Sequence, residues 1–197
     1  MTANGQKALR DTLKRQSFDG AYYIYGEDDF QKEDALQQLV DAAVEPVSLR
    51  DFNMEILRAG ETGVRSLDAA LSAVPMMADR RIVVIRDAGS LKKDSRKVLD
   101  RYLDSPSPDV LVLLIEAAGG KTDKGLAKAA TPLEFESLSA DRIPRWISHH
   151  ASTNLGLKLS PEAIELLQAA VGTDLRQLVT ELDKLASFTS GRQVEEA

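Results

Sequence analysis

The chain has 197 residues, of which 43% are hydrophobic and 28% are charged, and its 25 basic and 31 acidic residues give a net charge of −6. This length suits one or two domains, and the composition excludes disorder through most of the chain. The longest unbroken apolar run, Val110 to Ile115, is too short to cross a bilayer. The polar, mixed start of the chain predicts no secretory leader. We therefore expect a cytoplasmic protein without a membrane anchor.

The residues that usually bind metals are scarce. There are no cysteines, which excludes disulfides, thiol nucleophiles and thiolate zinc sites. The two histidines, His149 and His150, are adjacent and so point to different faces of a helix. A metal pair would need a spacing of three or four residues, so we expect a solvent-facing pair and no metal site.

The first two thirds of the sequence alternate predicted helices and strands. Helices are expected at 6–15, 30–43, 64–74, 91–103 and 124–130, and strands at 21–26, 52–60, 81–87, 109–116 and around 133–135. The third and fourth strands are continuously apolar, which is typical of a parallel sheet covered on both faces. We expect an α/β unit with a five-stranded parallel sheet flanked by helices, spanning residues 1–138.

The second strand and the helix after it are predicted from their apolar spacing. The alternation of Phe52, Met54 and Ile56 predicts a half-buried strand. The helix that follows is expected to bury one apolar stripe and to end before a proline: Val64, Leu67, Leu71 and Val74, then Pro75.

After residue 138 the apolar period becomes that of helices alone. Ser160 and Pro161 predict an N-cap and a first helical position, and Gly172 predicts the end of that helix. We expect a small all-helical domain from residue 139 to 197. The acidic ending "RQVEEA" adds no closing element, so we expect a fragment of a longer protein.

A degenerate phosphate-binding loop follows the first strand. In the pattern G-x-x-x-x-G-K-S/T, backbone N–H groups and the lysine hold phosphates and the hydroxyl holds magnesium. The segment "GEDDFQKE" keeps Gly26 and Lys32 at the first glycine and lysine positions, but Gln31 replaces the second glycine and Glu33 the hydroxyl residue. Together with Asp34, which follows it, this acidic segment carries a charge of −4, which repels polyphosphate.

The predicted third strand ends without the acidic residue that an ATPase needs to activate water. Asp87 stands where an ATPase has a magnesium-binding aspartate, but Ala88 replaces the glutamate that activates water. Two separate losses in one site predict no ATP hydrolysis and no bound cofactor. A second such ending, in "GGKT" at 119–122, has Ile115 at its first-glycine position and is interpreted as a surface turn.

A basic segment runs from Arg80 to Arg101, with eight basic and three acidic residues. Two interpretations stay open: a solvated helix face, or a surface for an acidic partner or a DNA backbone. The residues that would form such a patch are Arg80, Arg81, Lys92, Lys93, Arg96 and Lys97.

Three segments resemble the delta subunit family of the bacterial DNA polymerase III clamp loader: "YIYGEDDF", "RRIVVIRDAGSL" and "GTDLRQLVTELDKL". The resemblance extends over essentially the whole chain. It implies an AAA+-like sheet domain with a helical lid domain, no ATP hydrolysis, and a noncatalytic role in a DNA-directed DNA polymerase holoenzyme, a nucleotidyltransferase. Implied partners are the beta sliding clamp, the gamma/tau and delta prime subunits, and DNA through the assembled complex.

The resemblance also assigns a clamp-binding segment. In the family, an apolar pair at the end of the helix before the third strand binds and opens the ring-shaped clamp. Here that helix ends "SAVPMMADRR", which places Pro75, Met76 and Met77 at the contact, whereas the family pair is commonly a leucine with an aromatic residue. From the residues alone, burial of both methionines in the core is an equal alternative.

Two other functions stay open at this point. A nucleotide hydrolase would use Lys32 or Lys121 with Asp87, and a DNA-binding module would use the basic segment. The family has a third, C-terminal helical domain that packs the subunits into a ring, and this sequence ends before it.

Overall fold

The computed structural model describes residues 3–16, 18–44 and 49–189. The chain divides into two compact units, with the boundary between Ser137 and Leu138. Each unit is described by itself below.

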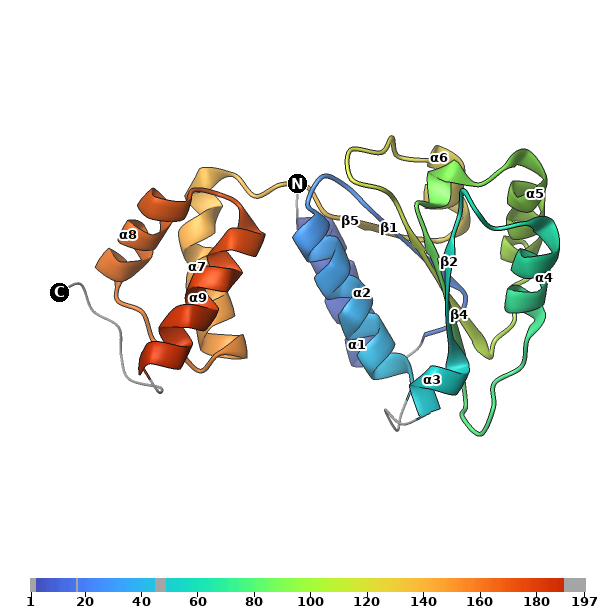
Figure 1. Ribbon diagram of the computed structural model, residues 1–197, viewed down its shortest axis with the longest axis horizontal. Coiled ribbons are helices and arrows are strands. Elements are labelled where there is room, and N and C mark those ends of the chain that lie inside the picture. Colours follow the sequence, from blue (N-terminus) through green and yellow to red (C-terminus); the bar gives the residue numbers. More distant parts are fainter. Residues whose placement is uncertain (1–2, 17, 45–48, 190–197) are drawn as a thin grey trace. The chain divides into compact units, whose positions relative to one another are not determined.

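The first unit is built on a five-stranded, all-parallel sheet (Figure 1). Its strands are β1 (Ala21–Tyr25), β2 (Met54–Arg58), β3 (Arg81–Arg86), β4 (Val110–Ile115) and β5 (Thr131–Glu134). They are arranged in the order β2-β3-β4-β1-β5. The predicted α/β class and the five-stranded parallel sheet are confirmed.

Helices cover both faces of this sheet (Figure 1). The helices α1 (Ala3–Arg15) and α2 (Asp29–Ala43) pack on one face. The helices α4 (Val64–Ser72), α5 (Lys93–Leu103) and α6 (Lys124–Ala129) pack on the other. The short helix α3 (Arg50–Asn53) precedes β2, and the short helix η2 (Ala88–Ser90) follows β3.

The central strands are apolar along their whole length because both of their faces are buried. In β3, Val83 and Ile85 join the core beneath α4 and α5, whereas Ile82 and Val84 join the core beneath α1 and α2. All four side chains are at most 1% exposed. Successive strand residues point to opposite faces, so a continuous apolar run is what two covered faces require.

The predicted second strand begins two residues too early. Arg50–Asn53 forms α3, and the strand starts at Met54. Phe52 is 61% exposed and Ile56 is 53% exposed, so the alternation does not mark a half-buried strand. The physical reason is that β2 is the edge strand of the sheet and has only β3 as a neighbour among the described strands.

The helix after β2 is also shorter than predicted. It ends at Ser72, and its C-cap Ala73 is already extended. Val64 and Val74 are 42% and 76% exposed, so the predicted stripe of four is wrong at both ends. The buried stripe consists of Leu67, Ala70 and Leu71.

Up to residue 189, the second unit contains three helices, α7 (Ile143–Asn154), α8 (Pro161–Val171) and α9 (Leu175–Thr189), after a short η3 (Ala140–Arg142). As predicted, the Ser160 side chain caps α8, accepting from the N–H of Ala163 at 3.2 Å, and Gly172 ends the helix with φ +84°. The acidic end of the sequence lies outside the described residues.

The adjacent histidines lie on α7, where His150 stacks on Trp146 with ring centroids 4.8 Å apart. Among the described residues, no group of three or more His, Cys, Asp or Glu side chains could hold a metal ion. In the same part of the chain, no helix combines the length and apolarity needed to span a bilayer.

A buried polar network joins β1 to the segment after β4. The Tyr23 hydroxyl donates to Glu116 Oε2 at 2.8 Å and accepts from the N–H of Asp123 at 3.0 Å. Arg96 of α5 donates to the Asp123 carboxylate. Burial raises the pKa of Tyr23, so this hydroxyl stays protonated and keeps its bond to Glu116. The network thereby fixes the chain between β4 and α6.

We expect the Asp123 carboxylate to make the free energy of unfolding depend on pH. The hydrogen bond from Arg96 lowers the pKa of Asp123. A carboxylate whose pKa is lower in the folded state stabilises the fold above its unfolded pKa of about 3.9, and this contribution is lost as pH falls through the folded value. Asp123→Asn should lower the free energy of unfolding by about 1 kcal/mol at neutral pH and by almost nothing near pH 2.

Urea unfolding at both pH values measures this difference. Asp94→Asn removes the exposed pair with Lys97 and serves as the control, with little effect at either pH. An Asp123→Asn deficit of the same size at both pH values would contradict the charge-based explanation.

Candidate functional site

The loop after β1 turns at Gly26, the position of the first glycine in the phosphate-loop pattern. Gly26 has φ +118°, and a Cβ added there would lie 2.2 Å from the carbonyl oxygen of Phe135. The N–H of Asp28 donates to the same carbonyl at 3.1 Å. Glycine is therefore required at position 26 by the close approach of the chain that follows β5, whether or not an anion binds.

Gln31 stands at the position of the second glycine, and its side chain forms hydrogen bonds at the start of α2. Asp28 caps the helix, accepting from the N–H of Gln31 at 3.0 Å. The Gln31 amide donates to the same carboxylate at 2.9 Å and accepts from Gln6 Nε2 at 2.8 Å. An N-terminal helix end favours an anion, and here the Asp28 carboxylate supplies one from within the chain.

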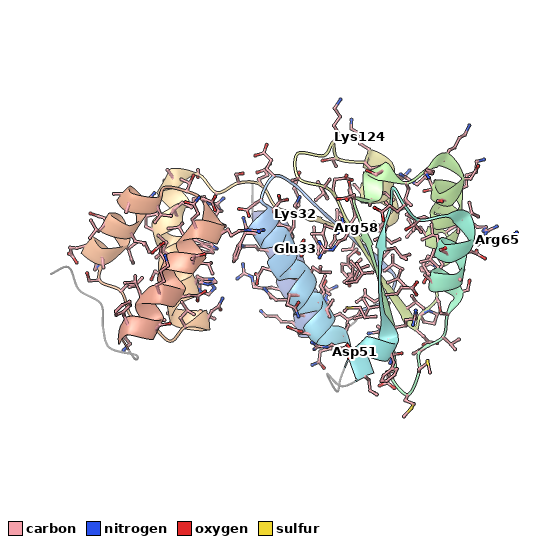
Figure 2. All side chains as sticks on the ribbon, in the orientation of Figure 1. Lys32, Glu33, Asp51, Arg58, Arg65 and Lys124 are labelled. Carbon is pink, nitrogen blue, oxygen red and sulfur yellow. The ribbon has the colours of Figure 1, made fainter. Side chains whose placement is uncertain are left out.

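Lys32 is turned into the protein at the N-terminal end of α2 (Figure 2). Its side chain is 2% exposed, and Nζ donates to the carbonyl oxygen of Glu116 at 3.1 Å and pairs with Asp29 Oδ1 at 2.8 Å. An ammonium group held in this way has two internal acceptors in place of phosphate oxygens.

Glu33, at the position of the magnesium-binding hydroxyl, forms a two-point ion pair with the last residue of β3. Arg86 donates from Nη1 to Oε1 at 2.5 Å and from Nη2 to Oε2 at 2.9 Å. These hydrogen bonds raise the pKa of Arg86. Bidentate arginine–carboxylate pairs are strong and directional, so both carboxylate oxygens of Glu33 are held by the end of β3.

The two residues after Arg86 form the start of a tight turn. Asp87 is left-handed at φ 57° and ψ 47°, and its carbonyl accepts from the N–H of Ser90 at 2.7 Å. Ala88 is fully buried in the core. The structure thus brings Glu33 to the end of β3, whereas Lys32 reaches the residue after β4.

The "GKT" ending at 119–122 lies in an exposed turn between β4 and α6, as predicted. No helix begins at Lys121; α6 begins at Lys124, after the Asp123 cap. A Cβ added at Gly120 would lie 2.8 Å from Glu116 Oε1, so this glycine serves the packing of the turn onto a buried carboxylate.

The basic segment is divided between opposite ends of the sheet. Arg80 and Arg81 stand at the start of β3, whereas Lys92 and Lys93 stand at the start of α5, beyond the end of the strand. A strand of this length separates its ends by about 17 Å. The six residues of the predicted patch are therefore two separate groups.

Four of these six side chains are paired within the chain. Their carboxylate partners are Asp19 for Arg80, Glu55 for Arg81, Asp123 and Asp100 for Arg96, and Asp94 for Lys97. Lys92 and Lys93 are exposed at the first turn of α5. Pairing removes much of the local positive charge that a DNA backbone would need.

The segment Pro75–Met77 lies in the loop between α4 and β3, at the same end of the sheet as α3 (Figure 1). Met76 and Met77 are 56% and 88% exposed, and the preceding Val74 is 76% exposed. The alternative in which both methionines belong to the core is wrong. Met77 also has φ +57°, a left-handed conformation that is uncommon for a side chain of this size.

Two residues of α3 beside this loop were missed from the sequence. Asn53 is fully buried, and its amide bonds both the N–H and the carbonyl oxygen of Met76. Phe52 is exposed next to it, with its carbonyl accepting from Arg81 Nη1 at 3.2 Å. Nothing in the sequence links positions 53 and 76, which are 23 residues apart and meet only in the folded chain.

The strand order, with β1 followed by a glycine loop and α2, defines an AAA+-like nucleotide-binding fold. RuvB, the Holliday junction branch migration motor of Thermotoga maritima, matches 94% of this chain and 60% of its own with a TM-score of 0.58 and 13% identity. The family model of the DNA polymerase III delta subunit matches residues 22–136. The chain belongs to this family.

Two proteins from Bacillus subtilis with delta-subunit names are similar to this chain. The DNA polymerase III subunit delta is 23% identical over 195 residues, covering 92% of this chain and 56% of the relative. The solved structure of the clamp loader delta protein YqeN matches 94% of this chain and 58% of its own, with a TM-score of 0.70 and 23% identity. The chain therefore spans less than two thirds of the length of these relatives.

The burial of Lys32 predicts a structural role for this lysine. Lys32→Ala removes the ammonium group and leaves the Glu116 carbonyl oxygen without this donor, so the free energy of unfolding should fall by about 1 to 3 kcal/mol. Lys124→Ala, at an exposed lysine of α6 (Figure 2), is the control and should change it by less than about 0.5 kcal/mol. Urea denaturation measures both, and equal stabilities would contradict the role.

Proposed function

We propose that this chain is the clamp-loader subunit that binds the beta sliding clamp and favours the open ring, without binding or hydrolysing ATP. The observation that carries the proposal is the exposure of Met76 and Met77 on a loop that is attached to the sheet domain. Membership of the delta subunit family supports the same role.

The binding step follows from burial of apolar surface. Met76 and Met77 expose long, unbranched side chains whose thioethers adapt to irregular apolar pockets. Moving such a side chain from water into a pocket contributes about 1.5 to 3 kcal/mol. Buried in a pocket at the centre of the interface, two adjacent side chains of this kind would supply its apolar anchor.

Ring opening would follow from a difference in affinity. If the pocket on the clamp accepts the two methionines better when that clamp protomer is relaxed, binding shifts the ring toward its open state. This step needs no energy from nucleotide hydrolysis by this chain. Its other proposed partners are the gamma/tau and delta prime subunits, and DNA through the assembled complex.

The absence of ATPase chemistry is proposed from the occupied phosphate site. Lys32 would have to leave the Glu116 carbonyl to reach a phosphate, and Glu33 would have to leave Arg86 to free the magnesium position. A carboxylate at the start of α2 also repels a phosphate there. A hydrolase that uses Lys32 would need both changes and would still have this repulsion to overcome.

The DNA-binding alternative has less support than clamp binding. The basic residues form two groups at opposite ends of β3, and most of them already have carboxylate partners within the chain. Lys92 and Lys93 are the pair that such contacts would use.

Replacing both methionines tests the proposal. Met76→Ala with Met77→Ala should weaken binding to the matching sliding clamp by about a hundredfold or more, because two apolar contacts are lost. Surface plasmon resonance with immobilised clamp measures the affinity. Leu166→Ala, which shortens a side chain 57% exposed in the helical unit, is the control with unchanged binding. Wild-type affinity in the double variant would rule the proposal out.

A calorimetric titration with Mg-ATP tests the second half of the proposal. We expect no binding at millimolar nucleotide, because the lysine and the helix end that would hold the phosphates have internal partners. A P-loop ATPase titrated under the same conditions is the positive control. Micromolar affinity for Mg-ATP, lost in Lys32→Ala, would favour the hydrolase alternative.

A further inference from the structure

Asn53 connects α3 to the loop that carries the exposed methionines. Its side-chain nitrogen donates to the carbonyl oxygens of Met76 at 2.9 Å and Leu49 at 3.0 Å. Its side-chain oxygen accepts from the N–H of Met76 at 2.7 Å. Both amide hydrogens and the amide oxygen are therefore used, and both main-chain polar groups of Met76 are bonded to a single side chain.

The part of the loop that carries the two methionines depends on this connection. Met76 and Met77 are 56% and 88% exposed, so their side chains gain little packing energy from the core. The left-handed backbone of Met77 costs about 1 to 2 kcal/mol for a residue with a Cβ. Without an external constraint, a short loop of this kind would populate many conformations.

We propose that Asn53 is the positioning residue of the Met76–Met77 contact, holding the loop in its binding conformation before the clamp arrives. This inference rests on the proposed function. An affinity falls in proportion to the fraction of molecules already in the competent conformation, so a residue that fixes the loop raises affinity without touching the partner. The full burial of Asn53 is consistent with an indirect role.

The chemistry of the contact requires an amide at position 53. Asparagine donates and accepts at once, which matches the N–H and the carbonyl of one peptide segment. Aspartate has nearly the same size and keeps the acceptor for the Met76 N–H, but has no hydrogen for the two carbonyl oxygens. Alanine removes every bond. Asn53→Asp and Asn53→Ala thus separate loss of the donors from loss of the whole contact.

The test measures clamp binding and loop order together. We expect Asn53→Ala to weaken clamp affinity roughly tenfold and Asn53→Asp to weaken it as well, because the loop then samples other conformations. In the free wild-type chain, hydrogen exchange at the Met76 amide should be slow. In Asn53→Ala this amide should exchange rapidly while the amides of β3 stay protected.

Thr62→Ala is the matched control. Thr62 is also a buried polar residue of the sheet domain, and its hydroxyl donates to the carbonyl oxygen of Arg58 at 2.6 Å, after the C-terminal end of β2. Its loss should lower the melting temperature without changing clamp affinity. A fall in affinity in Asn53→Ala, with none in Thr62→Ala, therefore distinguishes positioning of the loop from general stability.

The outcomes separate this inference from the proposed function. If Met76→Ala with Met77→Ala abolishes binding while Asn53→Ala binds as wild type, the role of Asn53 is wrong and the clamp-binding role stands. If the double methionine variant binds normally, both are wrong. Rapid exchange of the Met76 amide in the wild-type chain would also overturn the inference, whatever the stability of the variants.

Discussion

The buried ammonium group of Lys32 is the constraint on which the sheet domain depends. It lies at the start of α2 and bonds the carbonyl oxygen of Glu116, just after β4, so one side chain ties the first helix after β1 to the neighbouring central strand. The Glu116 side chain in turn bonds Tyr23 of β1. In a nucleotide-binding protein this space is left for phosphate, whereas here it is part of the core.

The residues next to Lys32 also have partners within the chain. Asp28 supplies the negative charge at the end of α2, and the Glu33–Arg86 pair connects α2 to the end of β3. Each of these groups has a strong internal partner at a position where an ATPase would bind phosphate or magnesium. These contacts therefore stabilise the AAA+-like sheet domain.

The opposite end of β3 carries the surface that we assign to protein recognition. The loop before the strand displays Met76 and Met77, and Asn53 of α3 holds its main chain from inside the domain. Because β3 is a central strand buried on both faces, its two ends are a fixed distance apart. The Glu33–Arg86 pair and the exposed methionines therefore lie at opposite ends of this buried strand.

The sequence by itself determined the parallel sheet, since apolar runs such as Val110 to Ile115 are needed only where both faces are buried. It also predicted the altered phosphate loop, because the replacements at Gln31 and Glu33 are local to one segment. Only the tertiary structure decided the exposure of Met76 and Met77, the edge position of β2 and the partners of the basic residues. Each of these depends on contacts between distant segments, and the bond between Asn53 and Met76 has no local pattern that could reveal it.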